Sequence, residues 1–111
     1  MMEPVGNPAS APGEVWSSGT WQVKAGGEDA FVEAWLAFAR WSEATHGPAR
    51  AWLLRDRDVA GRFVSIGPWP SDAAIEAWRA DPGFRERVGV IRSLVDAFEP
   101  STLDPVAAVP G

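Results

Sequence analysis

The stretch from Arg62 to Ala80, RFVSIGPWPSDAAIEAWRA, constrains the fold most, because it predicts a strand that leads directly into a capped helix. Its first five residues are rich in β-branched and aromatic side chains, and Gly67-Pro68 then ends the run, so the strand should stop near Trp69. Ser71 supplies a side-chain oxygen suited to a helix N-cap. An indole is therefore held at a strand-to-helix corner, where it either lines a ligand pocket or packs into the core, the commoner role for a tryptophan.

Length, charge and residue counts exclude several classes of function. A chain of 111 residues predicts one domain. The net charge is −5, and the ten basic residues are interleaved with acidic ones, which argues against a nucleic-acid partner. With no cysteine and a single histidine, the chain offers neither a thiol nucleophile nor a multi-histidine metal site, and we expect no bound metal.

The first residues differ in character from the rest of the chain. Residues 1–13 are rich in Pro, Gly, Ala and Ser, which predicts a flexible arm ahead of a domain over residues 14–109. The start of the chain lacks a basic segment followed by an apolar one, and no apolar run approaches the roughly 20 residues that span a bilayer. We therefore expect a soluble, cytoplasmic protein with no membrane contact.

A first strand, with its clearest part at Thr20 to Lys24, precedes a long amphipathic helix from Glu28 to about Thr45. Gly47-Pro48 should end this helix. Its apolar positions recur at steps of three and four and are unusually aromatic: Phe31, Ala34, Trp35, Phe38, Trp41 and Thr45.

The segment from Ala49 to Asp58 predicts a second strand, which a short turn at residues 59–61 would connect to the strand at Arg62 as a hairpin. Trp52 and Leu54 share one face of this strand, and Ala51 and Leu53 share the other. Because both faces are apolar, we expect both faces of the sheet to be covered.

A second helical piece should begin at Asp81-Pro82, with Asp81 as the N-cap. Its predicted apolar stripe is Phe84, Val88, Ile91 and Val95. The tail from Phe98 to Val109 contains Pro100 and Pro105, so it can form a strand only at a sheet edge.

The element order is thus β-α-β-β-α-β, which is typical of an α+β ferredoxin-like fold with an antiparallel sheet and helices on one face. Helices on one face leave the other face of the sheet bare. Since that face also carries apolar residues, we expect a second, identical chain to cover it in a homodimer.

Several segments together resemble the antibiotic biosynthesis monooxygenase family of the dimeric α/β-barrel superfamily. The resemblance runs from about Trp21 to Val106, and its motifs are VKAGGE, FVEAWLAFA, FVSIGPW, SDAAIEAW and DPGF. It implies a dimeric α/β barrel and the oxygenation of an electron-rich aromatic, such as a quinol or an anthrone, without metal, flavin or other cofactor. The haem-degrading branch of the family has an Asn on the first strand and a His on the following helix. This chain has Thr20 or Gln22 and then Trp78, with no His after position 46, so haem degradation is disfavoured.

Large rings from three segments should converge between the first helix and the sheet. We predict a pocket there that binds a small aromatic molecule and is lined by Trp35, Phe38, Trp69, Trp78 and Phe84. His46, at the end of the first helix, is the one imidazole available as a catalytic base, although a histidine at a helix end is more often a cap.

Three interpretations follow. The first is a cofactor-independent monooxygenase, and the second is a non-catalytic dimeric ligand-binding or accessory protein on the same fold. In the third, the indoles pack so completely that no cavity is left. A polar group directed into the cavity would favour the first, because proton removal from a phenolic substrate needs a base.

Overall fold

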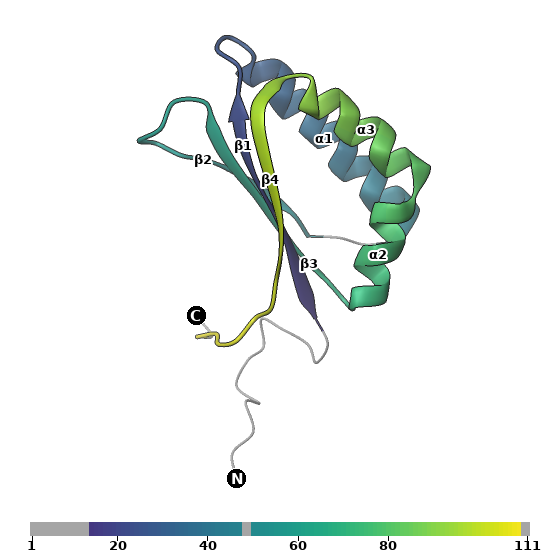
Figure 1. Cartoon of the computed structure of the whole chain (residues 1–111). Helices are drawn as coiled ribbons and strands as arrows, with labels where there is room; N and C mark the ends of the chain where they lie inside the picture. The colour runs from purple at the N-terminus through teal and green to yellow at the C-terminus, as the bar shows by residue number, and fades with distance from the viewer. Residues whose placement is uncertain (1–13, 48–49, 110–111) are drawn as a thin grey trace.

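The computed structural model describes residues 14–47 and 50–109, and the predicted arm over residues 1–13 lies outside the described residues. Its element order, β-α-β-β-α-α-β, confirms the α+β ferredoxin-like fold, with the second helical region divided in two (Figure 1). The elements are β1 (Val15–Val23), α1 (Glu28–His46), β2 (Trp52–Arg55), β3 (Arg62–Trp69), α2 (Asp72–Ala80), α3 (Pro82–Arg92) and β4 (Val95–Leu103).

The four strands form one antiparallel sheet in the order β2-β3-β1-β4. Two prolines lie within strands, and the sheet order explains how each is tolerated. Strand β2 pairs with β3 only as far as Ile66, so Pro68 lies where β3 has a free side. Pro100 lies in β4, which is an edge strand, as predicted for the tail.

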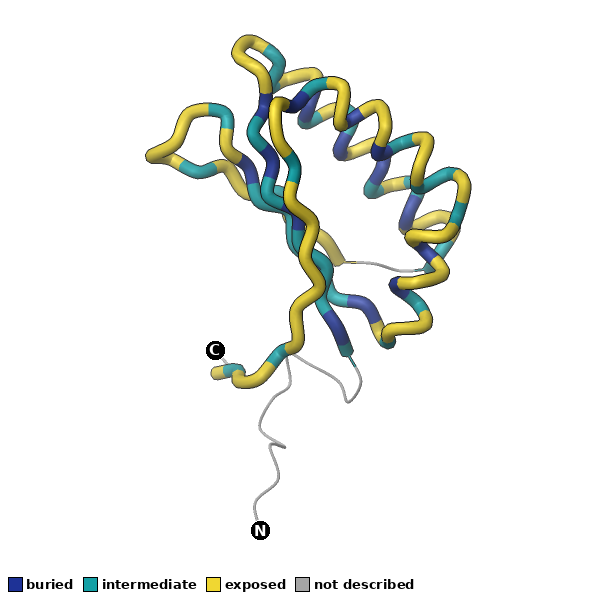
Figure 2. The backbone as a smooth tube through the Cα atoms, viewed as in Figure 1, coloured by how far each residue is buried: buried dark blue, intermediate teal, exposed yellow. Residues whose placement is uncertain are grey.

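The three helices cover one face of the sheet (Figure 1), and the buried residues lie where helices and sheet meet (Figure 2). Local side-chain caps start two of the helices. The Ser71 hydroxyl accepts from the Ala74 amide at 3.1 Å, and Asp81 Oδ1 accepts from the Gly83 amide at 2.8 Å. The turn between α2 and α3 is therefore fixed by Asp81 and Pro82, as the sequence predicts.

Several predicted boundaries are wrong, and strand β2 begins only at Trp52. Strand β2 ends at Arg55 rather than Asp58, because Asp56 Oδ1 accepts from the amides of Asp58 and Val59 and holds the chain in a turn. Val95 belongs to β4, where it pairs with Val23, and not to the helical stripe. Strand β4 accordingly starts earlier than predicted and ends at Leu103.

The face of the sheet opposite the helices is covered by no described element (Figure 1). Register places several large apolar residues on this face, none of which is buried, among them Trp16, Trp52, Leu54, Val64, Ile66 and Leu103. Trp16 and Trp52 stack across it, with ring centroids 6.3 Å apart. None of the helices over residues 14–47 and 50–109 is long and apolar enough to cross a membrane.

Candidate functional site

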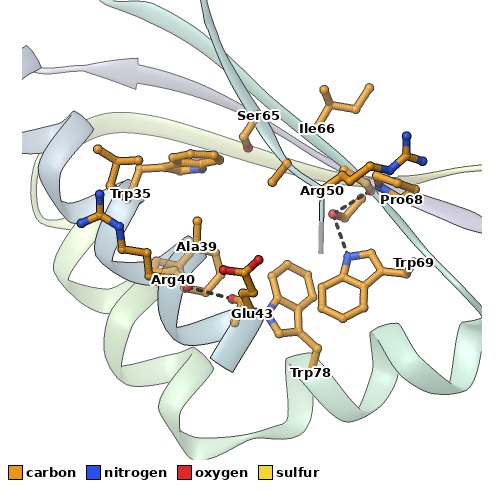
Figure 3. Close-up of a pocket in the computed structure, with 16 residues that line it drawn as sticks. Trp35, Ala39, Arg40, Glu43, Arg50, Ser65, Ile66, Pro68, Trp69 and Trp78 are labelled. Carbon is orange, nitrogen blue, oxygen red and sulfur yellow. Dashed lines mark hydrogen bonds between the residues drawn. The ribbon is translucent and has the colours of Figure 1, made fainter. Parts of the chain in front are cut away.

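A cavity of about 220 Å³ lies between α1, the end of β3, α2 and the chain at residues 50–51, and it is partly open to solvent (Figure 3). Gly67 allows the 50–51 segment to pass close to β3, because a Cβ atom there would lie 2.6 Å from the carbonyl oxygen of Arg50. The lining residues are Ser17, Trp35, Leu36, Phe38, Ala39, Arg40, Ser42, Glu43, Arg50, Ala51, Ser65, Ile66, Gly67, Pro68, Trp69 and Trp78.

Four of the five predicted pocket residues line this cavity: Trp35, Phe38, Trp69 and Trp78. The indoles of Trp69 and Trp78 lie 4.5 Å apart between centroids, and Trp78 lies 5.6 Å from Phe38. All four side chains are also buried, so they belong to the core and form the cavity wall at the same time. The aromatic packing therefore leaves a cavity open.

Phe84 does not line the cavity, contrary to the prediction. Its ring contacts Trp78 edge-on at 4.7 Å and Phe38 edge-on at 5.5 Å, from α3. Phe84 lies in the first turn of α3, three residues after the Asp81 cap, and it packs behind the wall formed by these two rings. Its contribution is to support the wall rather than to touch a ligand.

Three serines in the lining are missing from the predicted site, and each is already hydrogen-bonded. Ser17, Ser42 and Ser65 accept from the indole nitrogens of Trp69, Trp78 and Trp21 at 3.3, 2.9 and 2.9 Å. Each serine hydroxyl also donates to a backbone carbonyl, of Gly67, Phe38 and Gly19 respectively. These pairs satisfy the polar atoms of the wall and leave mainly ring surface to face a ligand.

The charged lining residues are Arg40, Glu43 and Arg50, which the predicted site also lacks. In α1, Leu36, Ala39 and Glu43 recur at steps of three and four, so helical spacing alone would have placed Glu43 beside the apolar stripe. Figure 3 shows the Glu43 carboxylate toward the middle of the lining residues, whereas the guanidinium groups of Arg40 and Arg50 lie toward the margins of the view.

His46 does not line the cavity. Its Nε2 lies 3.0 Å from Asp81 Oδ2, and its ring meets Trp41 edge-on at 5.5 Å. His46 therefore connects the end of α1 to the cap of α3, and the geometry gives it no role as a base in this cavity. Among the described residues, no group of three or more His, Cys, Asp or Glu side chains could hold a metal ion.

The family model for antibiotic biosynthesis monooxygenases matches residues 17–89, which is more than half of the chain. The chain belongs to this family. The match extends from β1 to α3 and so contains every element that lines the cavity. No significant match was found among curated proteins.

Solved structures of similar proteins agree with this family assignment. SnoaB, a cofactor-independent oxygenase from Streptomyces nogalater, is 25% identical and aligns over 88% of this chain and 98% of its own, with a TM-score of 0.77. A proposed antibiotic biosynthesis monooxygenase from Caulobacter crescentus is 18% identical over 85% of this chain and 91% of its own, with a TM-score of 0.76. The second likeness, at such low identity, concerns the fold alone.

Proposed function

We propose that this member of the antibiotic biosynthesis monooxygenase family oxygenates an electron-rich aromatic, such as a quinol or an anthrone, without a cofactor. The observation that carries the proposal is the cavity walled by Trp35, Phe38, Trp69 and Trp78, whose neighbouring serines are occupied by indole N–H groups. Such a wall favours the flat face of an aromatic ring. The similarity to SnoaB, a cofactor-independent oxygenase, supports the same reaction class.

The reaction requires the protein mainly to bind the substrate and to remove a proton from it. An anthrone that loses a proton from the CH₂ group between its two aromatic rings becomes a delocalised carbanion, which donates electrons to O₂. With O₂ as the oxidant, the CH₂ group becomes a carbonyl and one oxygen atom leaves as water. An apolar cavity that excludes water suits such an intermediate.

The volume of the cavity limits the size of the ligand. About 220 Å³ lies just below the roughly 300–1,000 Å³ of pockets for drug-sized molecules. We therefore propose a compact planar substrate of a few fused rings, with its edge at the open side.

This function can be tested by measuring oxygen uptake with an anthrone in two variants, each of which replaces one alanine of α1 by phenylalanine. Ala39 lines the cavity, and Ala37 is exposed on α1 and does not line it. Ala39→Phe should fill the cavity and abolish both oxygen uptake and quenching of indole fluorescence by the anthrone. Ala37→Phe should behave as the wild-type protein does.

The outcomes separate the two classes of function. The monooxygenase is supported if the wild-type protein consumes oxygen and forms the anthraquinone, and if Ala39→Phe abolishes this oxygen uptake. Quenching without oxygen uptake would instead favour a non-catalytic ligand-binding protein. If planar aromatics neither quench the fluorescence nor are consumed, the cavity has another use and the proposal fails.

A further inference from the structure

The lining of the cavity contains few polar groups that are free to act on a ligand. The hydroxyls of Ser17, Ser42 and Ser65 each accept from an indole and donate to a carbonyl, as described above. A hydroxyl with its proton committed to a carbonyl and a lone pair committed to an indole is a poor proton acceptor. The serines therefore position the indoles and are unsuited to act as bases.

The two arginines are unsuited to take up a proton because a guanidinium stays charged at all ordinary pH values. The Arg50 guanidinium lies 5.8 Å from the ring centroid of Trp52, a residue of the bare face of the sheet. Figure 3 shows the guanidinium groups of both Arg40 and Arg50 directed away from the centre of the lining residues. They can attract an anion to the mouth of the cavity and cannot act as a base within it.

Glu43 is the remaining ionisable group of the lining, and it is an exposed residue of α1. Over residues 14–47 and 50–109 it forms neither an ion pair nor a side-chain hydrogen bond. Its backbone is fixed near the end of α1, where the Glu43 carbonyl accepts from the Gly47 amide at 3.1 Å. A carboxylate without a partner is thus held by a rigid helix beside the aromatic wall.

We propose that the Glu43 carboxylate is the base that removes the proton from the aromatic substrate. This inference rests on the proposed function. In the step, a C–H bond of an anthrone or an O–H bond of a quinol breaks, and an O–H bond forms on Glu43. The electron pair stays on the ring system as a delocalised anion, which O₂ then oxidises.

Glu43 is exposed, so its carboxylate can meet the edge of a planar ligand that enters the cavity from its open side. The alternative base, His46, is held by Asp81 outside the lining. Glu43 is therefore better placed to meet a substrate edge at the open side of the cavity.

The test compares Glu43→Gln with Glu33→Gln in two assays. Glu33 is an exposed residue of the same helix that does not line the cavity, so its substitution is a matched control. The first assay measures, without oxygen, whether bound anthrone shows the absorption band of its anion. The second measures steady-state oxygen uptake, with fluorescence quenching as an independent measure of binding.

We expect wild-type protein and Glu33→Gln to form the bound anion and to consume oxygen. Glu43→Gln should bind anthrone with an unchanged quenching curve, form no anion, and lose about 10²-fold or more in kcat, the typical contribution of a general base.

Each other outcome is informative. If Glu43→Gln keeps its kcat or ionises bound anthrone as the wild type does, the inference is overturned and the proposed function stands. If wild-type protein ionises bound anthrone through Glu43 but consumes no oxygen, the proton acceptor is confirmed and the monooxygenase is wrong. A wild-type protein that leaves the anthrone neutral, or does not bind it, overturns the inference as well.

Discussion

Each of three tryptophans donates its indole proton to a serine that is distant in the chain. The pairs Trp21–Ser65, Trp69–Ser17 and Trp78–Ser42 join residues 44, 52 and 36 positions apart. Helical spacing predicts which rings face the core, but strand register and helix packing decide which hydroxyl each indole meets. For this reason the aromatic wall could be predicted from the sequence, whereas the serines that hold it could not.

Removing the serine hydroxyl of the most buried of these pairs should destabilise the protein. Ser42 and Trp78 are 5% and 8% exposed, so Ser42→Ala would leave the Trp78 N–H without an acceptor and without water. We expect the free energy of unfolding to fall by about 1–3 kcal/mol. Chemical denaturation measures it. Ser93→Ala removes an exposed hydroxyl and should change stability by less than about 0.5 kcal/mol; an equal loss in both variants would contradict the prediction.

Helices, strands and caps were predicted best where a local signal sets them, as at Ser71 and Asp81, whose side chains bind amides two or three residues ahead. The end of α3 was missed because Val95 continues the spacing of Val88 and Ile91, although it lies in a strand. The Ser93 and Leu94 amides close the last turn onto Gly89 and Ile91, and the chain then enters the sheet. Val95 faces the core from β4, and its helical spacing from Val88 and Ile91 is therefore a coincidence.

Replacement by alanine should have opposite effects on stability at two glycines of α3. A Cβ atom at Gly83 would overlap ring carbons of Trp41, whereas one at Gly89 would meet no atom within 4 Å. Gly83→Ala should therefore destabilise the protein by roughly 1–3 kcal/mol through overpacking. Gly89→Ala should stabilise it by roughly 0.5–1 kcal/mol, because alanine costs less backbone entropy in a helix. Thermal melts of both variants decide this, and shifts of the same sign would refute it.

At the scale of the whole molecule, the sheet has one covered face and one bare face. The order of helices and strands predicts this asymmetry, and the apolar residues on both faces of the strand that carries Trp52, Leu53 and Leu54 predict that the bare face is covered as well. In the structure, Leu53 packs against the core, and Trp52 and Leu54 stay exposed on the bare face. The apolar residues of the bare face therefore favour association with a second molecule.

We predict that a second copy of the chain covers the bare face in solution, because a patch that includes two stacked indoles is costly to leave in water. Light scattering at micromolar concentration should give twice the mass of one chain. Leu54→Glu should give the monomer mass, since it places a charge within the apolar patch. Val90→Glu is a matched control, because Val90 on α3 is 56% exposed and Leu54 is 53% exposed. The control should remain dimeric; a wild-type mass of one chain, or an unaltered dimer in Leu54→Glu, would show that another partner or solvent covers this face.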